Sequence, residues 1–153
     1  MRGVLVSMGA GDRATWLYDS FRGLPKPIDP TDIDLSMMDH YLGVSLETVK
    51  DNFQAFGLLS DSVRFVPGWF NDTLPYAEVE RIALLRLDGD MYESTMVALT
   101  SLYPKVSIGG YVVIDDFGAI ERCKRATRDF RERNGITSPI IQIDWTGAYW
   151  QKS

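Results

Sequence analysis

Two apolar runs that each end in a pair of acidic residues constrain the fold most strongly. The run "RIALLRLDGD" is nearly all apolar before Asp88 and Asp90, and "YVVIDD" ends in Asp115 and Asp116. Continuous apolar runs of this kind are typical of strands that are buried on both faces of a parallel sheet. The sequence therefore predicts an α/β fold in which acidic side chains follow two buried strands.

Strand-like and helix-like patterns alternate along the chain. We expect strands within residues 15–21, 62–70, 81–90, 111–116, 139–145 and 147–152, and helices within 1–12, 45–57, 92–103 and 119–135. Ser45 is a candidate N-cap and Gly57 a candidate helix end. Pro104 should end the third helix, and a Gly109-Gly110 turn should lead into "YVVIDD". The last two strands follow each other directly, which predicts a mostly parallel sheet with an antiparallel C-terminal strand.

Bulk properties narrow the class of protein. A chain of 153 residues is long enough for one domain, residues 1–153, with one core. Its net charge of −5 argues against a nucleic-acid binder, and no apolar run is long enough to span a membrane. A single cysteine, Cys123, fits a reducing, cytoplasmic setting. With one histidine, His40, any metal would be held mostly by oxygen.

The acids at the strand ends are candidate metal ligands. Ligands of open α/β sheets bind outside the carboxyl ends of the strands. The strands that end at Asp88 and Asp115 are joined by one helix, so they should be neighbours, and Asp88 should converge with one or both of Asp115 and Asp116. Carboxylates that converge suit Mg²⁺. The alternative is helix capping, by Asp90 before the helix at Tyr92 and by Asp116 before the next helix.

An earlier acid, Asp19, ends the first predicted strand. An acid in that place often accepts hydrogen bonds from ribose hydroxyls of a nucleotide-type ligand. The alternative is a turn-forming aspartate before Ser20.

Four long stretches resemble the macrocin O-methyltransferase family: "DSFRGLPKP", "VRFVPGWFNDTLP", "LLRLDGDMYESTMVALTSLYPKVSIGGYVVIDDFGAI" and "IDWTGAYWQK". The resemblance covers nearly the whole chain. It implies a Rossmann-like, class I methyltransferase sheet. It also implies an enzyme that uses S-adenosylmethionine and Mg²⁺ to methylate sugar hydroxyls of natural products.

The resemblance also implies roles for individual acids. The metal ligands would be Asp88, Asp115 and Asp116. Asp90 would act as the general base or would orient the substrate, so that Asp88 and Asp90 are the candidate catalytic residues.

The cofactor-binding residues implied by the resemblance lie earlier in the chain. Asp19 would hold the ribose of S-adenosylmethionine, with Ser20 beside it. Gly68 and Trp69 would lie near the adenine, although Trp69 could equally be a core aromatic residue. His40 falls in a long loop, where we expect it to be a surface residue.

The start of the chain departs from the family pattern. The first strand and glycine-rich turn of a class I methyltransferase are not recognisable, and Gly3, Gly9 and Gly11 do not follow a strand. We therefore expect weak or absent binding of S-adenosylmethionine. We also expect a homo-oligomer, because a gap in the middle of the sheet would leave backbone groups unpaired.

Three functions remain open from sequence alone. The first is the sugar O-methyltransferase, and the second is a non-catalytic, oligomerising methyltransferase-fold remnant. The third is a phosphatase of the haloacid dehalogenase type, because "LRLDGDMY" has its apolar strand followed by D-x-D. That class needs a strand-end Ser or Thr and a Lys, for which Ser107 and Lys105 are the nearby candidates, and both lie in a predicted helix-ending turn.

Overall fold

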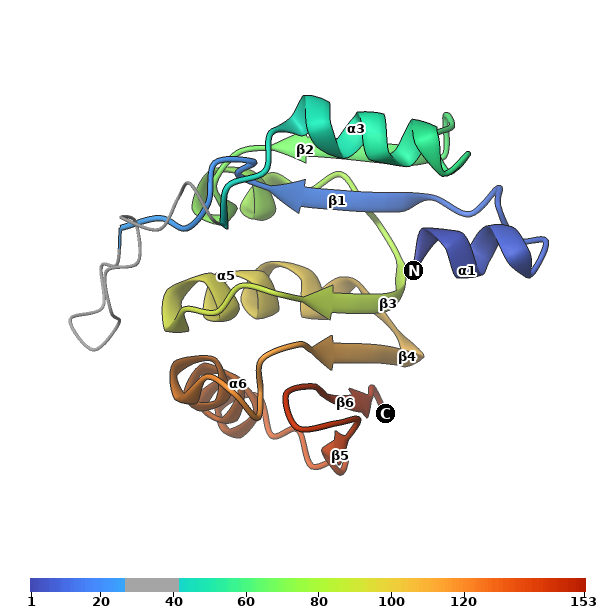
Figure 1. The fold of residues 1–153 in the computed structure, drawn as a ribbon. Helices are drawn as coiled ribbons and strands as arrows, with labels where there is room; N and C mark the ends of the chain where they lie inside the picture. The colour runs from blue at the N-terminus through green and yellow to red at the C-terminus, as the bar shows by residue number, and fades with distance from the viewer. Residues whose placement is uncertain (27–41) are drawn as a thin grey trace. The chain divides into compact units, whose positions relative to one another are not determined.

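The computed structural model describes residues 1–26 and 42–153, so His40 lies outside the described residues. The chain divides into two compact units, which are drawn in Figure 1. The described part of unit 1 is residues 1–26 and 42–69, and that of unit 2 is residues 70–153. The prediction of a single domain stays a prediction.

The described part of unit 1 contains a two-stranded parallel sheet, the helix α1 and the longer helix α3. Its elements are α1 (Arg2–Ser7), β1 (Thr15–Asp19), α3 (Leu46–Ala55) and β2 (Val63–Pro67). β1 pairs with β2 so that Asp19 lies opposite Pro67. Ser45 caps α3 as predicted, since its side chain accepts a hydrogen bond from the Thr48 N–H at 3.1 Å. An edge-to-face contact between Phe53 and Phe65 packs α3 against β2.

The buried Arg2 ties the first helix to the rest of unit 1. Its guanidinium donates to the Gly11 carbonyl at 2.7 Å, to the Ser60 hydroxyl at 2.8 Å and to the Leu58 carbonyl at 3.3 Å. The predicted helix over residues 1–12 is shorter in the structure, because it ends at Ser7 and the chain then turns.

Unit 2 contains a four-stranded sheet with the order β3-β4-β6-β5. Its strands are β3 (Ile82–Leu87), β4 (Val106–Ile114), β5 (Ile141–Gln142) and β6 (Ala148–Gln151). β3 and β4 are parallel, whereas β6 runs antiparallel to both β4 and β5. The mostly parallel sheet with an antiparallel C-terminal strand is confirmed.

The two long helices of unit 2 follow β3 and β4 as predicted, and three short helices were not predicted. The two long ones are α5 (Tyr92–Leu102) and α6 (Glu121–Arg133), and the short ones are α4 (Phe70–Thr73), η2 (Leu74–Tyr76) and η3 (Tyr103–Lys105). α5 packs against α6 and against β3. The core of this unit includes Leu87, Leu99, Ile114, Phe130 and Trp150, all below 9% exposed.

Several predicted element boundaries are wrong. The strand predicted over residues 62–70 ends at Pro67, and α4 begins at Phe70. The Gly109-Gly110 pair lies inside β4 and not in a turn before it. It forms an irregularity in the pairing with β3, where Gly109 has φ +78° and a Cβ on Gly110 would lie 2.8 Å from the Ser107 carbonyl oxygen. Only glycine fits both demands.

None of the helices in the described ranges combines the length and the apolar character needed to cross a membrane.

Candidate metal centre and cofactor-binding residues

Two neighbouring parallel strands bring the acids of unit 2 together. β3 ends at Leu87 and β4 at Ile114, and these two residues lie opposite each other. The Asp115 N–H continues the ladder by donating to the Leu87 carbonyl at 2.9 Å. Asp88 and Asp115 therefore leave the sheet side by side, as the predicted neighbouring strands required.

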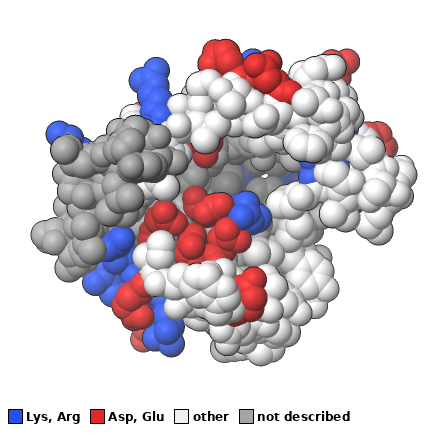
Figure 2. Space-filling view, in the orientation of Figure 1, with Lys and Arg blue, Asp and Glu red and all other residues white. Residues whose placement is uncertain are grey.

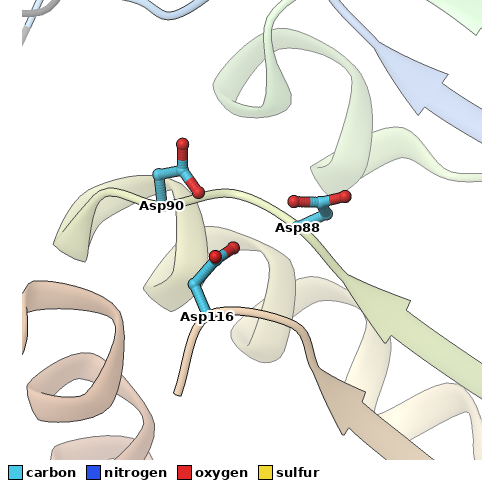
Figure 3. Close-up of side chains that lie close together, drawn as sticks. All are labelled: Asp88, Asp90 and Asp116. Atoms are coloured by element: carbon cyan, nitrogen blue, oxygen red, sulfur yellow. The ribbon is translucent and has the colours of Figure 1, made fainter. Parts of the chain in front are cut away.

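Three of the four acids form a cluster. Asp88, Asp90 and Asp116 each offer a carboxylate oxygen, and these oxygens lie within 4.8 Å of one another. Figure 3 shows the three side chains converging from the two loops that follow β3 and β4. Hard oxygen donors from three carboxylates are the donor set that suits Mg²⁺ and similar ions, so the residues present fit a divalent ion.

The fourth acid, Asp115, is directed to a basic side chain. The Arg86 guanidinium contacts Asp115 through Nη2 at 2.5 Å and through Nε at 3.3 Å. The same Nη2 lies 3.0 Å from Oδ2 of Asp88. The cluster thus contains Asp90, and not Asp115, together with Asp88 and Asp116. The roles assigned to these residues stay predictions.

Asp90 is held in an uncommon backbone conformation. Its φ of +54° lies in the left-handed region, and the Met91 N–H donates to the Gly89 carbonyl at 2.5 Å across it. Tight turns of this kind around a residue other than glycine are strained and cluster at functional sites. The turn aims the Asp90 carboxylate back toward Asp116 (Figure 3).

The capping alternative for these acids does not hold. The N-cap of α5 is Met91 and that of α6 is Ile120, and neither cap uses a side chain. The Asp90 and Asp116 carboxylates are therefore not the caps of these helices. The phosphatase alternative also loses its lysine, because Lys105 donates to the Ala77 carbonyl at 2.6 Å.

The proximity of the acids changes their protonation. The pKa of Asp116 is raised from 3.8 to about 6, first because burial disfavours its charged form and then because Asp90 lies beside it. Burial also raises the pKa of Asp88, while the Arg86 charge works against that rise. Acidic side chains gather on this face of the molecule (Figure 2). Carboxylates that repel one another in this way favour either a shared proton or a cation.

The sequence analysis missed Arg86 as part of this site. The signal was present, because Arg86 precedes Asp88 by two residues in the strand predicted over 81–90, and residues two apart on a strand share a face. A basic residue within an otherwise apolar strand indicates a nearby acidic partner, here Asp88 and Asp115.

The predicted cofactor residues lie at the corresponding end of the sheet in unit 1. Asp19 ends β1, and its carbonyl accepts a hydrogen bond from the Gly68 N–H at 2.9 Å, which brings the ends of β1 and β2 together. The Asp19 carboxylate accepts from the Phe21 N–H at 2.7 Å. Ser20 donates to the Gly23 carbonyl at 2.7 Å, and Trp69 is half-buried. Asp19 therefore forms the turn that the alternative interpretation expected, and a cofactor role for these four residues stays a prediction.

The sequence profile of the macrocin O-methyltransferase (TylF) family matches residues 1–152. The chain belongs to this family. It is 49% identical, over 99% of its length, to a tetracenomycin-C 4'-O-methyltransferase of Streptomyces olivaceus that acts on a dimethoxy-rhamnosyl derivative. It is 45% identical, over 99% of its length, to the mycinamicin III 3''-O-methyltransferase of Micromonospora griseorubida. It covers 59% and 62% of these two relatives, respectively.

A solved structure shows the same family fold. The chain superposes on the O-methyltransferase NovP with a TM-score of 0.95 and 44% identity, over 100% of this chain and 65% of NovP. The Rossmann-like methyltransferase fold expected from the resemblance is confirmed. The chain spans about 60% of the length of the two relatives named above.

Proposed function

We propose that the protein is an S-adenosylmethionine-dependent O-methyltransferase that acts on a sugar hydroxyl of a natural product and uses a divalent ion such as Mg²⁺. The observation that carries this proposal is the convergence of Asp88, Asp90 and Asp116 beside two parallel strand ends. Membership of the family and the names of the two O-methyltransferase relatives support the reaction class.

The acids would divide the work between holding the ion and moving a proton. Asp88 and Asp116 would hold the ion, together with Asp115 as the resemblance implies. A bound divalent ion makes a coordinated hydroxyl more acidic and fixes its oxygen. Asp90 would take the hydroxyl proton at its carboxylate while the oxygen bonds to the methyl carbon, the carbon–sulfur bond breaks and S-adenosylhomocysteine leaves. Much of the rate gain should come from orientation, because methyl transfer requires a linear approach.

In this proposal unit 1 supplies the cofactor contacts. The Asp19 carboxylate would accept hydrogen bonds from the ribose hydroxyls, with Ser20 beside it, and Gly68 and Trp69 would lie near the adenine. A carboxylate at the end of β1 has the chemistry and the strand-end position for this task.

Methyl transfer is the direct test of the proposed reaction. The protein is incubated with isotopically labelled S-adenosylmethionine, Mg²⁺ and a glycosylated acceptor such as an O-demethylated rhamnosyl tetracenomycin. We expect labelled product in the presence of Mg²⁺ and no product when EDTA removes the ion. Absence of product for all glycosylated acceptors, together with no S-adenosylmethionine binding at millimolar concentration, would instead support the non-catalytic alternative.

The role of Asp90 gives a sharper test. Asp90→Asn should lower turnover by about 10²–10⁴-fold, the usual contribution of a general base. Binding of S-adenosylmethionine, measured by calorimetry, should change little. The exposed Asp51 of α3, changed to Asn, is the control for the loss of one negative charge. Turnover within threefold of the unaltered protein would remove Asp90 from the mechanism.

We also propose that the chain forms a homo-oligomer. Among the strands that the structure describes, β3 has one hydrogen-bonded neighbour, β4, so that its other edge is available for pairing. A monomer mass in sedimentation velocity at micromolar concentration would contradict this proposal.

A further inference from the structure

Arg86 bridges two of the acids in the ion-free protein. Its Nη2 lies 3.0 Å from Asp88 and 2.5 Å from Asp115, and its Nε adds a second contact to Asp115. This is the planar fork with which arginine holds a carboxylate. One side chain thus neutralises part of a group of four carboxylates.

The geometry follows from the pairing of the two strands. Side chains two residues apart on a strand share a face, so Arg86 and Asp88 point to the same side of β3. Asp115 leaves β4 directly beside Asp88, because Leu87 and Ile114 lie opposite each other. Asp88 therefore belongs to two groups: it contacts Arg86 with Oδ2 and approaches Asp90 and Asp116 in the cluster.

We propose that Arg86 is an exchangeable counter-ion of the metal site. It holds Asp115 and one oxygen of Asp88 while no divalent ion is bound, and it releases them when the ion enters. This inference rests on the proposed function, since it requires the cluster to bind a divalent ion. It assigns to a positioning residue the task of keeping the acids together in the ion-free state and of limiting the affinity for the ion.

The exposure of the three side chains makes this exchange feasible. The Arg86, Asp88 and Asp115 side chains are 43%, 52% and 37% exposed, respectively. Ion pairs of that exposure are weak, because water competes for both partners. A divalent ion carries twice the charge of a guanidinium and binds oxygens at shorter distance, so it can displace Arg86 from Asp115.

The test measures binding of Mn²⁺ by electron paramagnetic resonance at constant pH. Arg86→Met should raise the affinity about tenfold, because a positive charge next to the ligands is removed. The exposed Arg128 of α6, changed to Met, alters the net charge equally and should leave the affinity unchanged. Arg86→Lys keeps the charge without the fork, is the milder change for folding, and should raise the affinity about threefold.

A double-mutant cycle separates exchange from simple charge. In the Asp115→Asn background, Arg86 has lost its main partner, so Arg86→Met should raise the Mn²⁺ affinity by clearly less than tenfold. In the presence of EDTA, Arg86→Met should also lower the melting temperature, whereas Arg128→Met should not, because only the former leaves neighbouring carboxylates unneutralised.

The outcomes distinguish this inference from the function on which it rests. Binding of Mn²⁺ to the unaltered protein with equal or weaker binding to Arg86→Met would overturn the role of Arg86 and leave the metal site standing. If Arg86→Met raised the Mn²⁺ affinity equally in the unaltered and the Asp115→Asn proteins, that result would also overturn the proposed exchange. No binding of Mn²⁺ by either protein at millimolar concentration would overturn both.

Discussion

At the scale of single residues, Asp116 has the clearest electrostatic signature. Its pKa of about 6 in the folded protein exceeds the ordinary value of 3.8. A carboxyl whose pKa is raised by folding contributes stability below pH 3.8 and loses that contribution as the pH rises through about 6. In the ion-free protein, the charged form of Asp116 therefore destabilises the folded state at neutral pH.

This destabilisation predicts that, in EDTA, the melting temperatures of Asp116→Asn and of the unaltered protein differ by an amount that depends on pH. The melting temperature of Asp116→Asn minus that of the unaltered protein should grow from pH 4 to pH 7. A gain of about 1 kcal/mol, discounted because the group is partly exposed, corresponds to about 2–4 °C. Differential scanning calorimetry at several pH values measures it, with Asp51→Asn as the charge control. A difference that is independent of pH would contradict the raised pKa.

The positions of the acidic residues could be predicted from the sequence only in part. The sequence predicted that Asp88, Asp115 and Asp116 would follow neighbouring strands, because chain order and parallel pairing decide where strands end. It could not tell which carboxylates meet. That depends on the left-handed turn at Asp90 and on the ion pair between Arg86 and Asp115, and side-chain direction in turns is not encoded in apolar periodicity.

At the scale of elements, the C-terminal hairpin braces the loop that carries Asp116. The Gly118 N–H donates to the Thr146 carbonyl at 2.6 Å. The hairpin turn is fixed by Asp144, whose carboxylate accepts from the Thr146 N–H at 2.9 Å and the Gly147 N–H at 2.7 Å. These backbone hydrogen bonds lower the pKa of Asp144. The turn at Asp144 therefore supports the loop that carries Asp116 through the hydrogen bond between Gly118 and Thr146.

The close approach at Gly118 leads to a prediction. A Cβ on this residue would lie 2.3 Å from the Trp145 carbonyl oxygen, so the two loops would have to separate. Gly118→Ala should lower the free energy of unfolding by about 1–3 kcal/mol. Gly3→Ala in α1 is the matched control, because its nearest neighbour would be Leu58 at 3.9 Å, and it should be neutral or stabilising. Urea unfolding curves that do not differ between the two variants would contradict this account of the loop contact.

Lys152 secures the end of the same hairpin. Its ammonium donates to the carbonyls of Val106 at 2.8 Å and Tyr103 at 3.0 Å, at the junction between α5 and β4. Lys152→Met should cost about 1–2 kcal/mol in urea unfolding, the range for hydrogen bonds from a charged donor. Lys124→Met is the control, since its pair with Glu121 at 3.8 Å is on the surface, and it should cost less than about 0.5 kcal/mol. Equal costs would contradict a special role for Lys152.

Element order was predictable from sequence, but several element boundaries were not. Apolar and aromatic runs identified the strands within 15–21, 81–90, 111–116 and 147–152, and helical spacing identified the long helices, because burial imposes both patterns. The irregularity at Gly109 and Gly110 was read as a turn, since glycine pairs mark turns and strand irregularities alike. The hairpin strand predicted over 139–145 shrinks to Ile141–Gln142, because ladder pairing and not apolar content decides strand length.

At the scale of the whole molecule, the predicted functional residues divide between the two units. The cofactor candidates follow the strands of unit 1, and the acids follow the strands of unit 2. Each group lies at the carboxyl ends of parallel strands, where ligands of α/β sheets bind. The proposed function would require both groups, because methyl transfer needs a methyl donor and an activated hydroxyl.

The central claim is that Asp88 and Asp116, beside Asp90 in the acidic cluster, hold a divalent ion, and isothermal titration with Mg²⁺ tests it most directly. The account predicts one ion per chain for the unaltered protein. Asp116→Asn should weaken binding at least tenfold, because a ligand charge is lost, and Asp51→Asn should bind as the unaltered protein does. Absence of binding at millimolar Mg²⁺, or equal affinity in the presence and absence of the Asp116 carboxylate, would contradict the account.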